Sequence, residues 1–175
     1  MPKFLILGHG RHGKDTLAEF WKEKFDMKFQ SSSMAACRKV IMPVLQEKYG
    51  YETVEECYED RINHRQEWYD LICDYNSEDG SRLCREILHD DGNDCYVGMR
   101  AKRELEASRT LFDLIIFVDA SERHPPEGEK SCTITKEDAD VIITNNGTLE
   151  EFRKKAEHIG RLMLKKGSIN KTWAS

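Results

Sequence analysis

The sequence has no apolar run that approaches the roughly 20 residues of a membrane-spanning helix. It also lacks an excess of basic residues, because 27 lysines and arginines are outnumbered by 32 aspartates and glutamates, for a formal net charge of −5. General affinity for DNA or RNA backbone is therefore not expected, and any basic site must be a local pocket. The first residues do not resemble a signal peptide. We expect a cytoplasmic protein with neither a membrane nor a nucleic acid as partner.

Little in the chain is suited to a structural metal or a disulfide framework. The six cysteines include no pair with C-x-x-C spacing. The absence of such a pair predicts reduced thiols in a reducing compartment rather than a zinc site or a set of disulfides. No serine–histidine–aspartate arrangement stands out either.

Length and composition fit a single folded unit. A chain of 175 residues can bury one substantial core, and no repeat or linker divides it, so the predicted domain spans residues 1–175. Hydrophobic residues make up 39% and charged residues 34%, the balance of a globular protein with a well-charged surface.

A strand, a glycine-rich loop and a helix at the start of the chain organise the prediction. The apolar run at residues 4–7 is typical of a short buried strand, and the spacing from Gly8 to Gly13-Lys14 is that of a phosphate-binding P-loop. Glycines let consecutive backbone N–H groups surround an anion, and the helix N-terminus adds partial positive charge. Lys14 can then reach the outer phosphates of a nucleoside triphosphate. The predicted nucleotide contacts in this loop are Gly8, Gly10, Arg11, His12, Gly13, Lys14, Asp15 and Thr16.

Two oxygen-bearing side chains follow the lysine. Asp15 stands where a P-loop normally offers a serine or threonine hydroxyl to Mg²⁺, and Thr16 comes next. A carboxylate is a hard oxygen ligand suited to Mg²⁺. Asp15 and Thr16 are therefore the predicted metal ligands.

Strands and helices alternate along the rest of the chain. Strands are expected at residues 4–7, 27–30, 95–99, 114–118 and 141–144. Helices are expected after the P-loop, at 34–49 with a kink at Pro43, at 53–75, at 81–89, at 101–111 and after Thr148. Continuously apolar strands that alternate with helices indicate a parallel sheet covered on both faces, whose ligands bind at the carboxyl ends of the strands.

Four side chains in the middle of the chain have the spacing of one helical face. At positions i, i+3, i+4 and i+7 they are Arg61, His64, Arg65 and Trp68. Two guanidiniums beside an aromatic ring can bind a phosphate and stack on a base. The alternative is a solvated face whose arginines pair with neighbouring carboxylates.

Further cations are candidates for phosphate contacts. Arg85 lies on a predicted helix where a ligand contact and an ordinary surface charge are equally good explanations. Arg100 follows the third strand, which places it beside the P-loop, and Arg123 lies in a polar, Pro-containing stretch that can act as a lid. The predicted catalytic residues are Lys14, Arg100 and Arg123. The predicted acceptor contacts are Ser33, Arg38, Arg61, His64, Arg65, Trp68, Arg85 and Arg100.

The acceptor class follows from a missing base. Transfer to an alcohol needs a carboxylate to take the hydroxyl proton. A phosphate monoester, whose second ionisation has a pKa of about 6, needs none. Several arginines without an evident base therefore favour a phosphate monoester.

With these residues in view, the chain resembles the bacteriophage deoxynucleoside monophosphate kinases, which are P-loop enzymes. Residues 13–16 reproduce the family's G-K-D-T ending, which phosphomevalonate kinases partly share. Residues 138–151 are similar to the family's final strand and helix, including the Asn145-Asn146-Gly147 turn, and Arg100 matches the arginine after the third strand.

The resemblance implies a three-layer α/β/α P-loop kinase fold with a five-stranded parallel sheet of order 2-3-1-4-5. It implies a helical monophosphate-binding region at about 31–90, a short lid at about 120–139, and nucleotide contacts from Asn145, Asn146 and Gly147. ATP and Mg²⁺ would act as donor, and a deoxynucleoside monophosphate (dNMP) as acceptor, in the host cytoplasm if the protein is phage-encoded.

Other functions stay open at this stage. The family's aspartate before the third-strand arginine is replaced by Gly98-Met99, and Asp15 or Asp119 are the candidates to supply that carboxylate. One alternative is a P-loop kinase for another small phosphorylated metabolite, such as phosphomevalonate. Another is a nucleotide-binding regulatory protein that transfers no phosphate. Whether two copies form a homodimer is also open.

Overall fold

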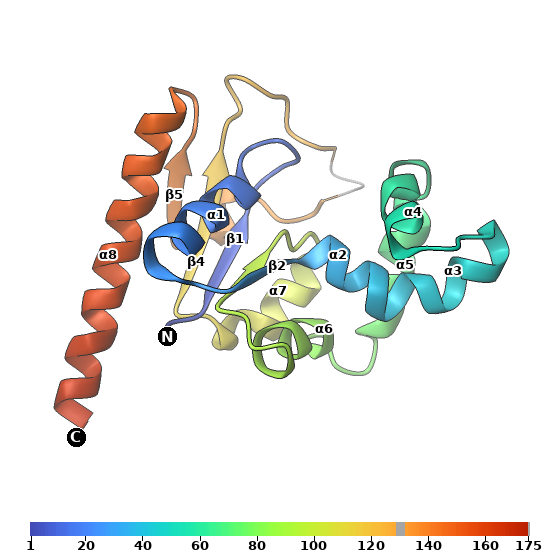
Figure 1. Cartoon of the computed structure of the whole chain (residues 1–175), viewed down its shortest axis with the longest axis horizontal. Helices are drawn as coiled ribbons and strands as arrows, with labels where there is room; N and C mark the ends of the chain where they lie inside the picture. The colour runs from blue at the N-terminus through green and yellow to red at the C-terminus, as the bar shows by residue number, and fades with distance from the viewer. Residues whose placement is uncertain (129–131, 175) are drawn as a thin grey trace.

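Five strands form one parallel sheet in the computed structural model, which describes residues 1–128 and 132–174 (Figure 1). Beyond residue 165 only the backbone is described. The strands are β1 (Phe4–Leu7), β2 (Phe29–Ser31), β3 (Cys95–Val97), β4 (Leu114–Asp119) and β5 (Val141–Thr144). Their order is β2-β3-β1-β4-β5, and every neighbouring pair is parallel. The predicted fold class and strand order are confirmed.

The central strand β1 is buried on both faces, as its four apolar residues predict. Phe4 and Ile6 belong to one core cluster, packed with α1 (Lys14–Phe25) and α8 (Leu149–Ala174). Leu5 and Leu7 belong to a second cluster on the opposite face. Successive residues of a strand point to opposite faces, so an unbroken apolar run supplies both cores.

Helices cover both faces of the sheet and extend to one side of it. The remaining helices are α2 (Ser32–Ala36), α3 (Met42–Tyr49), α4 (Val54–Glu59), α5 (Arg65–Tyr75), α6 (Arg82–Arg85) and α7 (Lys102–Ser108). Figure 1 shows α8 beside β5 at one side of the molecule and α3, α4 and α5 gathered at the other. None of the described helices is both long and apolar enough to cross a membrane.

Two predicted helices contain a π-helical turn. The helix expected at 34–49 is divided into α2, the π-helical segment Cys37–Ile41 and α3. Pro43 falls in the first turn of α3, directly after the π-helical segment, and it has no N–H to donate to the preceding turn. The wider turn before it therefore absorbs the irregularity that a kink was expected to supply. The helix expected at 81–89 likewise continues from α6 into the π-helical segment Glu86–Asp90.

The prediction of one helix over residues 53–75 is wrong. The capping box of Thr53 and Glu56 starts α4 as expected, but the segment turns 3-10 at Asp60–Asn63 and α5 begins only at Arg65. Asp60 accepts hydrogen bonds from Asn63 Nδ2 at 2.7 Å and lies 2.9 Å from His64 Nε2. Such local side-chain bonds compete with helix formation, and here they end it.

A carboxyl group is buried against β3, away from the P-loop helix. Glu104 of α7 is 6% exposed, and its Oε1 accepts a hydrogen bond of 2.8 Å from the Tyr96 hydroxyl. Burial raises the pKa of Glu104 to about 7, from a usual value of 4.5. The folded protein therefore holds a proton that the unfolded chain releases between these two values.

We predict a stability that falls with pH because of this group. The contribution of Glu104 is fully present below pH 4.5 and is lost as the pH rises through about 7. A shift of this size corresponds to about 3 kcal/mol in the free energy of unfolding. Glu104→Gln cannot titrate, so urea denaturation from pH 5 to 8 should show the stability of the wild type falling relative to this variant. Parallel curves would contradict the prediction.

Candidate functional site

Glycines shape the loop between β1 and α1. Gly8 has φ +147° and Gly13 has φ +107°, a region of backbone conformation that favours glycine. A Cβ at Gly8 would lie 2.7 Å from the carbonyl oxygen of Val118, and one at Gly13 would lie 2.6 Å from Asn145 Nδ2. The loop therefore needs glycine at both positions, for conformation and for space.

The start of α1 is open to an anion. Gly13 is the N-cap residue, and no side chain in the described part of the chain caps this end of the helix. The first N–H groups of a helix have no partner within the helix, and together with the helix dipole they attract negative charge. This is the arrangement that the P-loop spacing predicts.

The His12 ring holds the loop in place. It is fully buried, with Nδ1 accepting a hydrogen bond of 3.1 Å from the Ala120 N–H and Nε2 lying 3.1 Å from the His124 carbonyl oxygen. Because Nδ1 accepts, the neutral ring carries its proton on Nε2 and donates it to that carbonyl. Both ring nitrogens are thus engaged with the backbone of the segment that follows β4.

The turn at residues 145–147 lies against the P-loop. Asn145 Nδ2 donates a hydrogen bond of 3.0 Å to the His12 carbonyl oxygen. The Asn145 N–H donates one of 2.7 Å to the carbonyl oxygen of Asp119, at the end of β4. Arg123 Nε donates to the Asn145 carbonyl oxygen at 2.8 Å, which places this predicted catalytic residue at the turn. Asn146 Oδ1 accepts from the Glu122 N–H at 3.2 Å.

The helix after this turn begins as predicted. Thr148 and Glu151 form the expected capping box: the Glu151 N–H donates to Thr148 Oγ1, and the Thr148 N–H donates to Glu151 Oε2. Gly147 directly precedes this pair, and an added Cβ would meet the Glu151 carboxylate. A side chain there would disturb the start of α8.

Three cations and one carboxylate meet beside the loop. Lys14 Nζ donates a hydrogen bond of 2.9 Å to the His9 carbonyl oxygen. Arg100 forms a short ion pair with Glu127 Oε2, and Arg65 Nη1 lies 3.9 Å from Glu127 Oε1. Arg100 therefore lies at the rim that the sequence predicts, and Glu127 is a partner that sequence analysis did not identify.

The pKa shifts at this position reflect burial and the charge of Arg100. Burial, followed by the charge of Arg100, holds the pKa of Lys14 below its usual value. Burial alone would raise the pKa of Glu127, but the hydrogen bond and charge of Arg100 outweigh it and keep that pKa low. Glu127 is therefore ionised at neutral pH, among groups that attract an anion.

Gly98, which directly follows β3, lies beside the P-loop lysine. A Cβ at Gly98 would lie 3.6 Å from Lys14 Cε and 3.2 Å from Ser32 Oγ. A longer side chain here would meet the P-loop lysine. Ser32 Oγ donates a hydrogen bond of 3.1 Å to the Gly98 carbonyl oxygen. The space beside Gly98 is therefore occupied by Lys14 and Ser32.

Oxygen-bearing side chains that could hold the predicted Mg²⁺ lie on the first turn of α1 and at the end of β4. Asp15 is exposed on that turn and Thr16 is partly buried beside it, so both fit the expected ion by their chemistry. Asp119 accepts a hydrogen bond of 2.9 Å from the Ser121 N–H, and hydrogen bonds from Ser121 hold the pKa of Asp119 below its usual value.

All six cysteines are free thiols.

The predicted acceptor residues of the 53–75 segment do not share one face. The Arg61 guanidinium stacks 3.8 Å from the centre of the Tyr58 ring and donates to the Tyr58 carbonyl oxygen at 2.7 Å. His64 stacks on Tyr49 with ring centroids 4.2 Å apart. Trp68 is 6% exposed, within a core cluster. The helix break at His64 separates Arg61 from α5 and corrects the predicted convergence.

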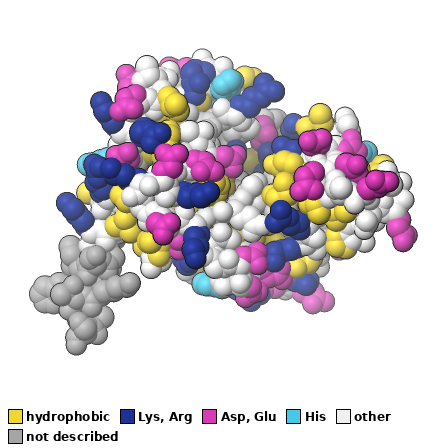
Figure 2. Space-filling view, in the orientation of Figure 1, with side chains coloured by type: hydrophobic (Ala, Val, Ile, Leu, Met, Phe, Trp, Pro, Cys, Tyr) yellow, Lys and Arg dark blue, Asp and Glu magenta, His cyan; other side chains and the backbone are white. Residues whose placement is uncertain are grey.

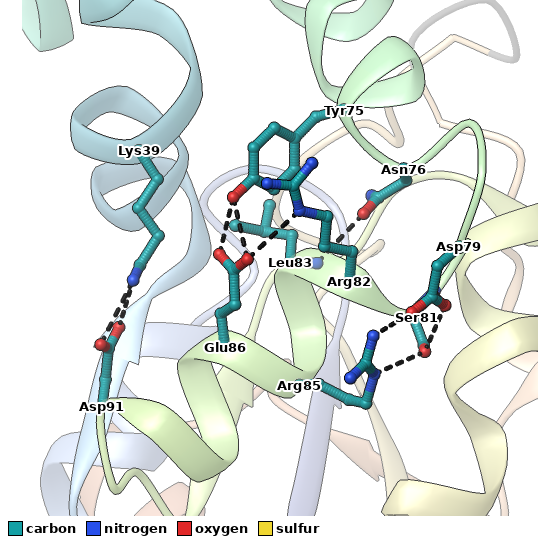
Figure 3. Close-up of polar contacts among 10 residues, drawn as sticks. All are labelled: Lys39, Tyr75, Asn76, Asp79, Ser81, Arg82, Leu83, Arg85, Glu86 and Asp91. Carbon is teal, nitrogen blue, oxygen red and sulfur yellow. Dashed lines mark hydrogen bonds and ion pairs between the residues drawn. The ribbon is translucent and has the colours of Figure 1, made fainter.

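Arg85 is also tied elsewhere. Figure 3 shows its guanidinium directed at Asp79 and Ser81, with a hydrogen bond of 3.2 Å from Nε to Ser81 Oγ. Figure 1 places α6 level with the N-terminus of the chain, at the amino ends of the strands. The sequence grouped Arg85 with Arg100, whereas the structure places α6 toward the opposite end of the sheet.

Arg38 and Ser33 lie in or beside α2. Arg38 is exposed at an open hollow of about 290 Å³, which is lined by Gln30, Ala35, Arg38, Lys39 and Asp91. Ser33 is partly buried. Of the predicted acceptor residues, Arg65 and Arg100 are the two that the structure brings to one partner, Glu127.

The cationic site is local. Figure 2 shows acidic and basic side chains interspersed over the face seen in that view.

Within the predicted lid at about 120–139, residues 129–131 lie outside the described residues, and Lys136–Asp138 form a short 3-10 turn. The other described residues of this stretch form no helix or strand, as its composition predicts.

Comparisons with known proteins add little to this geometry. No protein-family model matches the sequence, and no curated protein matches it. Among solved structures, the chain is similar to shikimate kinase from Aquifex aeolicus vf5, with 12% identity, a TM-score of 0.48, and coverage of 95% of this chain and 98% of that one. A likeness of this extent says nothing about activity.

We predict that Gly13→Ala is damaging because of a collision, beyond the cost of its backbone angle. Gly50 provides a matched control: it also has a positive φ, of +71°, but a Cβ there would have nothing within 4 Å. Gly50→Ala should therefore cost about 1 kcal/mol in the free energy of unfolding. Gly13→Ala should cost clearly more, because it also disrupts the Asn145 contact. Equal costs in urea denaturation would contradict this account.

Proposed function

We propose that this protein is an ATP-dependent phosphotransferase that phosphorylates a small phosphate monoester. The observation that carries the proposal is the meeting of Lys14 and Arg100 beside an uncapped helix start that follows a glycine-built loop. Phosphoryl transfer needs charge neutralisation and positioning more than covalent chemistry, and this site supplies both.

The proposed roles follow from position. Loop N–H groups and the start of α1 bind the donor phosphates, and Lys14 stabilises the γ-phosphoryl group during transfer. Arg100 and Arg65, which both pair with Glu127, are the proposed contacts of the acceptor phosphate. Bound Mg²⁺, held by Asp15 and Thr16, would neutralise charge on the donor phosphates.

The bond changes require no base. An ionised oxygen of the acceptor phosphate attacks the γ-phosphorus, the bond from that phosphorus to the bridging oxygen breaks, and ADP leaves. The acceptor oxygen is already ionised near neutral pH. We propose a dNMP as acceptor because of the resemblance at residues 13–16 and 138–151. Arg65 and Arg100 would serve another phosphate monoester equally well, so phosphomevalonate stays a second candidate.

An ADP-release assay tests this function directly. Each of the four dNMPs, the matching ribonucleotides and phosphomevalonate would be offered with ATP and Mg²⁺. We expect ADP formation to depend on one of the monophosphates. Binding of ATP without ADP formation with any acceptor would instead support a regulatory nucleotide-binding protein.

We predict that Lys14→Ala abolishes transfer without unfolding the protein. A cation that stabilises transition-state charge is worth several kcal/mol, so kcat should fall by at least about a hundredfold. Burial opposes the charge of this lysine, so its removal should not lower the melting temperature substantially. Retention of more than about a tenth of the wild-type kcat would refute this role.

We predict that Arg65→Ala weakens binding of the acceptor and leaves binding of ATP unchanged. Loss of one charge-assisted hydrogen bond should raise KM for the monophosphate by about tenfold, with little change in KM for ATP. Arg65→Lys should recover part of the loss, because an ammonium cannot form the bidentate fork.

Arg85→Ala is the matched comparison for this experiment. The sequence gives both arginines the same role, whereas the structure pairs Arg85 with Asp79. We expect Arg85→Ala to leave both KM values unchanged. If Arg85→Ala raises KM for the monophosphate and Arg65→Ala does not, the proposed acceptor site is wrong.

A further inference from the structure

Glu127 lies directly over the phosphate-binding loop. Its Oε1 is 3.0 Å from the position that a Cβ would take at Gly10, and its N–H donates a hydrogen bond of 3.1 Å to His9 Nδ1. Its side chain is 15% exposed. A single residue thus contacts two consecutive positions of the loop, through its backbone and through its carboxylate.

The carboxylate has cationic neighbours on several sides. Arg100 forms a short ion pair with Oε2, and Arg65 Nη1 lies 3.9 Å from Oε1. The charge of Lys14 also favours the ionised form of Glu127 and helps to keep its pKa low. These arginines and the lysine are the groups to which we assign phosphate contacts, so Glu127 is bound where a phosphate is expected.

A metal ion is a weaker explanation of this cluster. One ligand atom each of His9, Glu127 and Cys132 lie within 4.8 Å of one another. However, His9 Nδ1 already accepts a hydrogen bond from the Glu127 N–H. Burial is the main cause that holds the pKa of His9 below its usual value, and the charges of His12, Lys14 and Arg100 act in the same direction. Positive charge that disfavours a protonated histidine also disfavours a bound cation.

We propose that the Glu127 carboxylate is an internal anion that pairs with the cations to which we assign phosphate contacts, so that a polyphosphate binds only by displacing it from them. The proposal rests on the proposed function only in assigning phosphate contacts to Lys14, Arg65 and Arg100. It assigns to Glu127 control over the affinity of the site, because the apparent affinity for a ligand falls by the fraction of molecules in which the site is closed.

Glu127→Gln tests the proposal by binding alone. The probe is inorganic tripolyphosphate without metal, titrated calorimetrically at fixed ionic strength, because surface attraction varies with salt. The amide keeps the size of the side chain but loses the charge-assisted bond to Arg100. We expect Kd to fall by about tenfold relative to the wild type. An unchanged or higher Kd, or no binding by either protein, would overturn the proposal.

Two further variants separate occupancy from net charge. Glu122→Gln removes the same charge from an exposed position of the same loop and should leave Kd near the wild-type value. Glu127→Asp keeps the charge, but its shorter side chain cannot span from the backbone bond at His9 to Arg100, so Kd should also fall. If Glu127→Asp binds like the wild type, or if Glu122→Gln binds as tightly as Glu127→Gln, charge alone explains the effect and the proposal fails.

Failure of this proposal is distinguishable from failure of the proposed function. If the wild type forms ADP with an acceptor while Glu127→Gln binds tripolyphosphate no more tightly, the internal anion is refuted and the kinase function stands. If Glu127→Gln binds more tightly while no acceptor yields ADP, the internal anion stands without the kinase function.

Discussion

The site depends on the close approach of the P-loop to the ends of two other strands, β4 and β5. The loop passes so near the Val118 carbonyl and the Asn145 amide that glycine is required at Gly8 and Gly13. His12 and Asn145 then join the loop to the ends of β4 and β5 by hydrogen bonds. Three strand ends therefore hold one loop, which fixes the N-terminus of α1 in an orientation that an anion can use.

The sheet sets this geometry through burial rather than through the loop itself. Each central strand supplies alternate residues to two cores, so the strands are fixed in register on both faces. Their carboxyl ends then lie at one rim, where Lys14 and Arg100 come from different strand–helix connections. The energy of the cores is thus what holds two cations close together despite their repulsion.

The charge balance at the rim is completed by a loop residue. Lys14 and Arg100 without a partner would leave like charges close together in a partly buried site. Glu127 offsets them from the predicted lid, and the same carboxylate contacts the loop that is expected to hold phosphate. Stability of the ligand-free site and its affinity for an anion are therefore coupled through one side chain.

Local sequence determined the P-loop, the buried strands and the capping boxes at Thr53 and Thr148, because glycine spacing, apolar runs and capping pairs act over a few residues. The strand order came from the resemblance and agrees with the structure.

Tertiary structure alone decided the rest. Helical spacing aligned Arg61, His64, Arg65 and Trp68, but the bonds of Asp60 to Asn63 and His64 end that helix, and Trp68 is buried in the core. Glu127 has no periodicity or motif around it, and only the folding of its loop over Gly10 brings it to Arg100. The partners of a charge are set by long-range packing, which the spacing of residues along the chain does not record.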